Sequence, residues 1–428
     1  TLNNRGITLH HLGRYEEALR DCNRSLELCP DDPDTLNNRG ITLHHLGRYQ
    51  EALRDYNRSL ELRPNHPDTL NNRGITLHHL GRYEEALQDY NRSLELCPND
   101  SDTLNNRGVT LYHLGQYEEA LQDYNCSLKL RPKHPDTLNN RGITLHHLGR
   151  YKEALQDYSR SLKLRPNHPD TLNNRGITLE HRKRYKQAVA SYDQAIQAAQ
   201  RLGIEQSTYW RNRGGALYRL RRFQQCHYSF QRALDINGSD VAALNGLGVS
   251  LLALKQNEDA LKTLAQAAEQ QPEEALYHYN LAVALCRQGQ QERAKVELHS
   301  ALDLDPGFER AQQALNSPTP ATVDWWQWWL GSSVSRYRRA LAGFLLASLV
   351  GLLVLPLVYL VLPLVHGTSG RNAYEPGLEW QYYVGALVVV LFALLLPSVK
   401  SFKTSSIEME PQPSQPQAEL EPQLAKAE

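Results

Sequence analysis

A 34-residue segment recurs along the chain with little change. The text DTLNNRGITLHHLGRYQEALRDYNRSLELRPNHP runs from Asp34 to Pro67, and nearly the same text begins again at Asp68, Asp102 and Asp136. A constant period of this length is typical of stacked arrays, because one short unit cannot bury its apolar face alone and needs its neighbours. The chain is therefore predicted to be a repeat protein.

The first half of each unit reads as a helix. Asp34 and Thr35 offer side-chain oxygens that can cap its first turn. Leu36, Gly40 and Leu43 follow at helical spacing and form an apolar stripe. Gly47, which accepts the left-handed conformation at low cost, is expected to end the helix.

The second half of each unit reads as another helix, which Pro64 stops. Its predicted buried stripe consists of Ala52, Leu53, Tyr56, Ser59 and Leu60. Gly40 and Ala52 are small, so we expect the two helices to cross closely at these residues. Each unit is then a helix hairpin.

This pattern resembles the tetratricopeptide repeat, in which small and large residues alternate at fixed places along the unit. The matching residues here are Leu36, Gly40, Leu43, Ala52, Tyr56, Ser59 and Pro64. The resemblance implies an all-α, right-handed superhelical solenoid whose first helices line a concave groove for a peptide. About nine repeats are expected in residues 1–316, at 1–32, 33–66, 67–100, 101–134, 135–168, 169–206, 207–240, 241–274 and 275–308, with a cap at 309–316.

The C-terminal quarter differs abruptly from the repeats. Residues 317–339 form a linker with a Trp-rich segment, and 340–365 and 380–399 are uncharged runs long enough to cross a bilayer. The second run would follow a loop at 366–379. Residues 400–428, rich in Pro, Gln and Glu, are expected to be disordered. We therefore predict a two-helix transmembrane hairpin.

Cations flank the two predicted spans and indicate their orientation. Arg336, Arg338 and Arg339 precede the first span, and Lys400 and Lys403 follow the second. The positive-inside rule places both ends, and hence the repeats, in the cytoplasm. Tryptophans suit the headgroup region next to a span, although docking against the last repeat is an alternative. The predicted interface tryptophans are Trp325, Trp326, Trp328 and Trp329.

The second Asn of each NNRG motif recurs at the same position of successive repeats, and these asparagines form a ladder along the array. An amide offers both a donor and an acceptor, so such a row can hold an extended peptide backbone whatever its sequence. The alternative is that each Asn bonds the neighbouring repeat. The ladder comprises Asn4, Asn38, Asn72, Asn106, Asn140, Asn174, Asn212 and Asn280.

Two further ladders accompany the asparagines. The next residue is an Arg, such as Arg73, and an Asp, such as Asp89, lies in the second predicted helix of the same unit. We expect an ion pair between them across each hairpin. Histidine pairs recur as well, and His44, His78 and His146 are predicted to line the groove.

Metal binding by the histidine pairs is not expected. Adjacent helical residues diverge, and we place successive repeats about 20 Å apart, which is too far for one ion. A polar groove wall is the favoured interpretation, with protonation near pH 6 tuning the binding of acidic partners.

Composition and motifs exclude several function classes. The chain has 47 basic and 47 acidic residues, which gives no electrostatic basis for nucleic-acid binding. No phosphate-binding loop, dinucleotide fingerprint, zinc-protease or serine-hydrolase motif occurs, so no catalytic residue, cofactor or small-molecule substrate is predicted. The six cysteines are read as unpaired, semi-buried thiols, since no CxxC pair is present.

The sequence therefore predicts a membrane-tethered scaffold that binds a peptide segment or a partner helix of another protein. Thr1 falls inside a repeat, and we expect the sequence to be part of a longer chain. An alternative function follows from that expectation: the repeats would recruit substrates for an enzyme whose catalytic domain lies upstream. Long arrays of NNRG repeats resemble those common in bacteria, especially cyanobacteria, which implies a plasma or thylakoid membrane.

Overall fold

The computed structural model describes residues 1–316, which belong to two compact units. The described part of unit 1 is Thr1–Thr263, and the described part of unit 2 is residues 264–316. Every helix or strand assigned within these residues is an α-helix, so the predicted all-α class is confirmed for this part of the chain.

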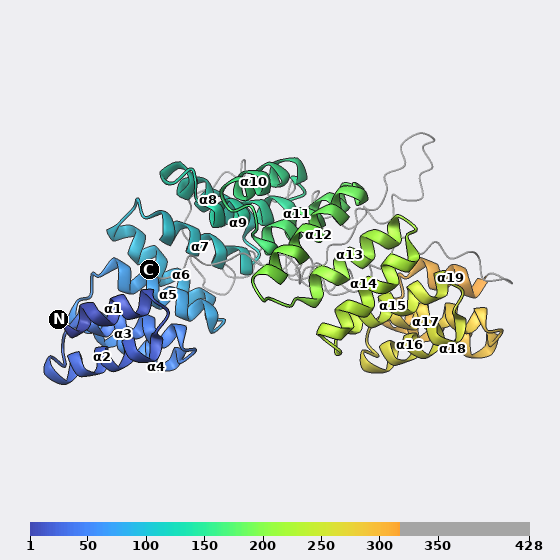
Figure 1. Cartoon of the computed structure of the whole chain (residues 1–428), viewed down its shortest axis with the longest axis horizontal. Helices are drawn as coiled ribbons and strands as arrows, with labels where there is room; N and C mark the ends of the chain where they lie inside the picture. The colour runs from blue at the N-terminus through green and yellow to red at the C-terminus, as the bar shows by residue number, and fades with distance from the viewer. Residues whose placement is uncertain (317–428) are drawn as a thin grey trace, which may run out of the picture. The chain divides into compact units, whose positions relative to one another are not determined.

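Nineteen helices follow one another in residues 1–316 (Figure 1). They are α1 (Leu2–His11), α2 (Tyr15–Leu28), α3 (Pro33–His45), α4 (Tyr49–Leu62), α5 (Pro67–His79), α6 (Tyr83–Leu96), α7 (Ser101–His113), α8 (Tyr117–Leu130), α9 (Pro135–His147), α10 (Tyr151–Leu164), α11 (Pro169–His181), α12 (Tyr185–Arg201), α13 (Ser207–Arg219), α14 (Phe223–Ile236), α15 (Val241–Ala253), α16 (Asn257–Gln270), α17 (Ala275–Arg287), α18 (Gln291–Leu304) and α19 (Glu309–Asn316).

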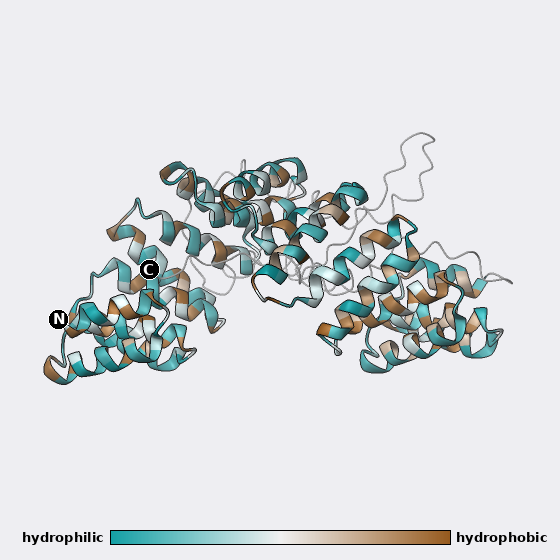
Figure 2. Cartoon of the chain, in the orientation of Figure 1, coloured by the Kyte–Doolittle hydropathy of each residue, from teal (hydrophilic) through white to brown (hydrophobic). Residues whose placement is uncertain are grey.

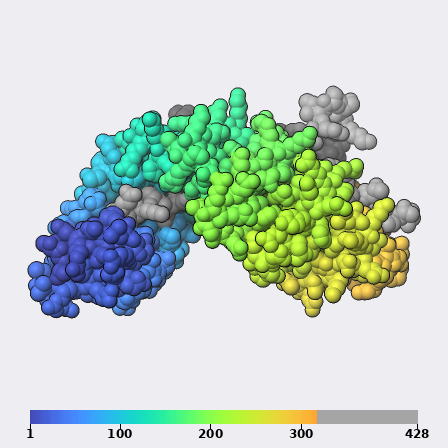
Figure 3. All heavy atoms as spheres, in the orientation of Figure 1, coloured from blue at the N-terminus to red at the C-terminus, as the bar shows by residue number. Residues whose placement is uncertain are grey.

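Consecutive helices of unit 1 pair into hairpins, and the hairpins stack in chain order. The colours of unit 1 accordingly follow one another from blue to green in Figure 3. The second helix of one hairpin also packs on the first helix of the next, as α2 does on α3 and α4 on α5. First helices of successive hairpins touch each other as well. Each helix carries both hydrophobic and hydrophilic residues (Figure 2), as stacking around a continuous core requires.

Glycine makes the tight turn inside most hairpins. Gly47 has a φ of +74°, and its N–H donates to the His44 carbonyl at 2.9 Å. The predicted end of the first helix is thereby confirmed within two residues, since α3 ends at His45. Lys183 and Arg221 take the same turn position later in unit 1 with φ of 56° and 59°. A side chain is tolerated there at a modest cost in backbone strain.

The predicted start of the first helix is wrong by two residues. Helix α3 begins at Pro33 and is preceded by Asp32, so Asp34 and Thr35 lie inside the first turn rather than at its cap. Proline suits a first helical position because its missing N–H would have no helical partner. In α5 the capping residue is His66, whose Nδ1 accepts from the Thr69 N–H at 3.2 Å.

Close packing of glycine against tyrosine holds each hairpin together. A Cβ placed on Gly40 would lie 2.5 Å from Cε1 of Tyr56, and Tyr56 is only 1 % exposed. Ala52 is fully buried in the same cluster. The predicted close crossing of the two helices at these small residues is therefore confirmed.

An ion pair crosses each of the first five hairpins as expected. Arg73 donates from Nε and Nη2 to the two carboxylate oxygens of Asp89, at 2.7 and 2.6 Å. Its Nη1 donates to Asn57 on the second helix of the preceding repeat, at 2.8 Å. One arginine thus connects three helices. The equivalent pairs are Arg5–Asp21, Arg39–Asp55, Arg107–Asp123 and Arg141–Asp157.

The sixth hairpin is longer than the others. Helix α12 has 17 residues where α4 has 14, and Ala198 and Ala199 in its last turn are buried against α13. Tyr209 on α13 belongs to the same apolar cluster, and Trp210 packs on it. The additional residues of this repeat therefore extend a helix.

The six cysteines are all free thiols, as expected. The predicted partial burial is confirmed for Cys286 alone. Cys22 and Cys226 are fully buried, while Cys29, Cys97 and Cys126 are exposed. Cys29 and Cys97 occupy the position just after a second helix, where the chain leaves the core. Sequence alone did not reveal this difference.

The described part of unit 2 contains the last residues of α16, the hairpin of α17 and α18, and the short helix α19. Ala282, Ala294 and Ala301 are buried in the hairpin, and Ala311 of α19 is fully buried. Helix α19 packs on α18, so the predicted terminal helix is present.

No helix within residues 1–316 has both the length and the apolar character needed to cross a membrane. The predicted linker, membrane hairpin, loop and disordered tail lie outside the described residues.

Candidate functional site

Seven first helices of unit 1 form a continuous row, which we call the first-helix face: α1, α3, α5, α7, α9, α11 and α13. Each touches the next in the row, and each carries the NNRG text or its variant at the same place. Seven of the eight predicted ladder asparagines lie in this row, from Asn4 to Asn212. Asn280 lies on α17 in unit 2, where it is 1 % exposed.

The ladder asparagines bond the neighbouring repeat. Asn72 donates from Nδ2 to the Oδ1 atom of Asn37, the first Asn of the preceding repeat, at 3.2 Å. The same bond recurs at every later junction of unit 1 up to α13, and at the earlier one. The other pairs are Asn38–Asn3 at 3.0 Å, Asn106–Asn71 at 3.1 Å, Asn140–Asn105 at 3.1 Å, Asn174–Asn139 at 3.2 Å and Asn212–Asn173 at 3.0 Å.

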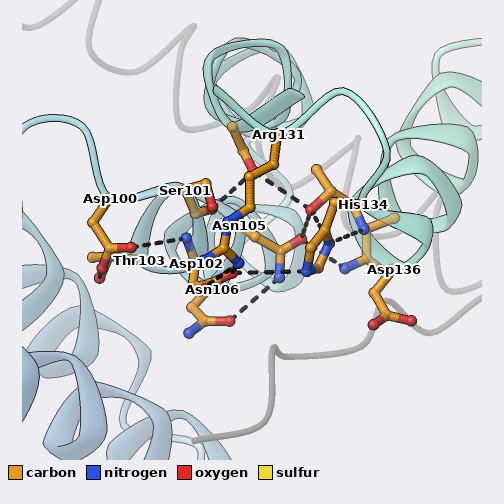
Figure 4. A network of polar contacts seen from close by, with 12 residues as sticks. Asp100, Ser101, Asp102, Thr103, Asn105, Asn106, Arg131, His134 and Asp136 are labelled. Carbon is orange, nitrogen blue, oxygen red and sulfur yellow. Dashed lines mark hydrogen bonds and ion pairs between the residues drawn. The ribbon is translucent and has the colours of Figure 1, made fainter. Parts of the chain in front are cut away.

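Figure 4 shows how densely these amides are connected in the fourth repeat. The Oδ1 atom of Asn105 accepts from Asn140 and from the Thr137 hydroxyl, both at 3.1 Å, while its Nδ2 donates to Asn106 at 3.3 Å. Asn105 and Asn106 have no exposed surface. The ladder asparagines therefore form hydrogen bonds between repeats, which was the alternative interpretation. These bonds account for the regular spacing of the asparagines.

The predicted groove histidines make a second set of bonds between repeats. Nδ1 of His44 lies 2.9 Å from Oγ1 of Thr76, whose hydroxyl proton goes to the Asn72 carbonyl at 3.1 Å. A hydroxyl has one proton, so the imidazole must donate from Nδ1. His78 and His146 repeat this arrangement with Thr110 and Thr178, at 2.9 and 2.8 Å.

Histidines of successive repeats lie much closer to one another than predicted. The rings of His44 and His79 have centroids 4.9 Å apart, and those of His10 and His45 are 4.7 Å apart. The predicted separation of about 20 Å is wrong, because first helices of successive repeats are direct neighbours with no second helix between them. Tyr49 stacks on His79 at 5.8 Å and completes a cluster of three rings.

Burial keeps these histidines neutral. It lowers the pKa of His44 and of His78 to about 3, with a smaller contribution from the neighbouring imidazoles. The pKa of His10 is lowered to about 4 for the same reasons. A switch near pH 6 at the first histidine of the pair is therefore contradicted for these residues, since protonation would charge a buried ring.

The arrangement offers hydrogen bonds and ring surfaces. Within residues 1–316, no group of three or more His, Cys, Asp or Glu side chains is placed to hold a metal ion. The predicted interface residues Trp325, Trp326, Trp328, Trp329, Arg336, Arg338 and Arg339 lie outside the described residues.

Sequence reasoning missed three participants in the first-helix face. The first Asn of each NNRG text accepts the bond between repeats, Thr76 and its equivalents relay the histidine bond, and Tyr49 and its equivalents stack on the next repeat. The signal was present, because all three recur from repeat to repeat as strictly as the chosen ladder. Periodicity alone does not say which side chains meet across a junction.

Comparison with known proteins identifies the helix hairpins as repeats of a known family. The tetratricopeptide repeat family matches overlapping stretches at residues 1–65, 31–99, 66–133, 99–167 and 135–201, and again at 245–307. The curated Protein STIP1 homolog of Dictyostelium discoideum is 27% identical over 119 residues, which are 28% of this chain. The matched segment spans 21% of that relative.

Two solved structures are similar to this chain at low identity. The Cut9–Hcn1 hetero-tetramer of the APC/C is 18% identical with a TM-score of 0.51, covering 70% of this chain and 59% of that one. The structure of YrrB, a TPR protein with an unusual peptide-binding site, is 23% identical with a TM-score of 0.38, and the match covers 45% of this chain and 98% of that one. The family matches take in more than half of the sequence and coincide with the helix hairpins, so this chain belongs to the tetratricopeptide repeat family.

Proposed function

We propose that this protein is a membrane-tethered scaffold whose first-helix face binds an extended segment or helix of a partner protein. Tetratricopeptide repeats mediate protein–protein interaction, and this chain carries a long array of them. The observation that carries the proposal is the continuous row of first helices, which presents the same polar side chains at every repeat.

The bonds between repeats are compatible with a peptide-binding role. An amide nitrogen has two N–H groups, so a ladder asparagine that keeps exposed surface, such as Asn38, can donate to Asn3 and also to a bound backbone. A network that fixes the amide before binding also lowers the entropy lost on binding. Exposed His79 on α5 adds a ring to the same row of first helices.

The tether is proposed from sequence. Residues 340–365 and 380–399 are each long and uncharged enough to span a bilayer, and the flanking cations favour a cytoplasmic array. Such a tether would hold the first-helix face close to the membrane and raise the local concentration of membrane-bound partners.

Binding by the asparagine ladder is tested with peptides selected from a random library against the full chain. The variant Asn4→Ala, Asn38→Ala, Asn72→Ala removes the ladder amides that retain exposed surface. It should bind the selected peptide at least about tenfold more weakly, because several backbone bonds are lost. The matched control replaces three second-helix asparagines, Asn57, Asn91 and Asn125, by Ala. Circular dichroism melts must show both variants folded at the assay temperature. Equal affinity of the two folded variants would remove the ladder from the binding account.

Membrane attachment is tested by alkaline carbonate extraction of membranes from cells that express the chain. The full chain should stay in the pellet, and a variant lacking residues 340–399 should be released. Protease added to inverted vesicles should digest the array if it faces the cytoplasm. Release of the full chain by carbonate would contradict the tether.

A further inference from the structure

One arginine of the array lacks the acidic partner that its equivalents have. The Arg of the NNRG text occurs seven times in unit 1, and each of the first five copies pairs with an Asp on the second helix of its own hairpin. These five are Arg5, Arg39, Arg73, Arg107 and Arg141. The sixth and seventh copies, Arg175 and Arg213, face Ser191 and Ser229 at the position of that Asp.

Arg213 obtains a carboxylate from another helix. Its Nε donates to Asp193 of α12 at 2.6 Å, and its Nη1 donates to the Ser229 hydroxyl at 2.6 Å. Asp193 occupies the place at which earlier repeats carry the asparagine, such as Asn57, that bonds the next repeat's arginine. The array therefore has two positions from which a side chain can meet this arginine, one on each flanking second helix.

Both positions are neutral around Arg175. Its Nε donates to the Ser191 hydroxyl at 3.0 Å, and its Nη2 donates to Oε1 of Gln194 at 2.9 Å. The position on the preceding second helix holds Ser159, whose hydroxyl donates to the Leu155 carbonyl of its own helix. Among the arginines of this ladder in the described residues, Arg175 alone has no ion pair with a carboxylate.

The nearby carboxylates are engaged with other arginines. Asp157 pairs with Arg141 at 2.7 Å, and Asp193 pairs with Arg213 at 2.6 Å. Burial lowers the pKa of Arg175, whereas Asp123 raises the pKa of its equivalent Arg107. A half-buried guanidinium with neutral neighbours is a site at which an anion gains more from pairing than it would in water.

We propose that Arg175, together with Ser159, Ser191 and Gln194, binds a carboxylate supplied by an acidic side chain of a partner protein. The ligand class follows from the five equivalent sites. In each of them the corresponding arginine binds a carboxylate, as Arg73 does through two parallel bonds. The site opens on the side of the second helices, since Ser159 on α10 and Gln194 on α12 are both exposed. It is separate from the first-helix face and does not depend on peptide binding there.

The first test compares the melting temperature of the full chain in sodium chloride and in sodium acetate, at constant pH and ionic strength. Acetate should raise the melting temperature of the wild type by about 2 °C more than that of Ser191→Asp, in which the new Asp occupies the site as in sister repeats. Arg175→Gln should also lose the acetate effect. Equal shifts in all three proteins would be a general salt effect and would overturn the proposal.

Ser191→Asp keeps the proposal testable even if Arg175→Gln does not fold. It should by itself raise the melting temperature in chloride, because it restores the ion pair of the first five repeats. If sulfate at matched ionic strength shifted the wild type as much as acetate does, the selectivity for carboxylate would be refuted.

A second arm identifies the source of the carboxylate. The peptide acetyl-Gly-Glu-Gly-amide should reproduce the acetate effect, and its Gln counterpart should not. If acetate acts and the Glu peptide does not, the site takes only small free carboxylates, and the assignment to a partner side chain is wrong.

Discussion

At the scale of single residues, each repeat depends on a few contacts that tolerate little change. The glycine of the NNRG text lies against a buried tyrosine, and the arginine before it joins two carboxylate oxygens on the paired helix. Each of these contacts recurs in five successive repeats, so one substitution can be compared with its equivalents along the same chain.

The substitution Gly74→Ala should destabilise the array by about 1–3 kcal/mol, because the new Cβ would lie 2.7 Å from Cε1 of buried Tyr90. Gly238→Ala is the matched control, since the nearest atom to its Cβ is the Leu234 carbonyl oxygen at 3.8 Å. Urea denaturation followed by circular dichroism measures both. A control that loses as much stability as Gly74→Ala would refute the steric explanation.

The substitution Arg73→Leu should cost about 2–3 kcal/mol, because it leaves the buried carboxylate of Asp89 without its partner. Arg92→Leu breaks a pair with Glu95 whose side chains are 51% and 64% exposed, and should cost less than about 1 kcal/mol. Adding Asp89→Leu to Arg73→Leu should recover part of the loss. Indistinguishable urea midpoints for Arg73→Leu and wild type would show that the pair contributes nothing.

At the scale of helices, the first-helix face is held together by polar bonds between neighbouring repeats. The amide bond from Asn72 to Asn37 and the relay from His44 through Thr76 to the Asn72 carbonyl both cross one junction. Buried polar bonds of this kind fix the register between helices that carry nearly identical sequences. A shift of one helix along its neighbour by a single turn would break several of these bonds at once.

The array should lose stability on mild acidification, from about pH 6.5 downward. The folded state lowers the pKa of His44 and His78 to about 3 and that of His10 to about 4, so only the unfolded chain takes up these protons in that range. Stability then rises with pH until the unfolded histidines are neutral. The urea midpoint at pH 7 should exceed that at pH 5.

Tyr112 provides a natural control for this pH dependence. It occupies the equivalent position in the fourth repeat, where its hydroxyl contacts Nε2 of His147 at 2.5 Å. The variant His10→Tyr, His44→Tyr, His78→Tyr should reduce the difference between pH 7 and pH 5, to which His146, His147 and His181 still contribute. An unchanged pH difference would assign the acid sensitivity to other groups.

At the scale of the whole molecule, the sequence predicted the architecture better than the contacts between repeats. Period, stripes and the Gly–Tyr crossing were sufficient for the helix hairpins, because these depend on spacing within one unit. The predicted separation of histidines in successive repeats, such as His44 and His79, was wrong, since it depends on which helices become neighbours on stacking. The role of the first Asn of each NNRG text was missed for the same reason.

The central claim is that the first-helix face receives a protein segment, and a site-specific photocrosslinker tests it most directly. A photoreactive amino acid at position 79, where exposed His79 lies on a first helix, is compared with one at exposed Arg92 on a second helix. The full chain is irradiated with the peptide selected against it. Crosslinks should form from position 79 and not from position 92. Crosslinks from position 92 alone would contradict the assignment of the binding face.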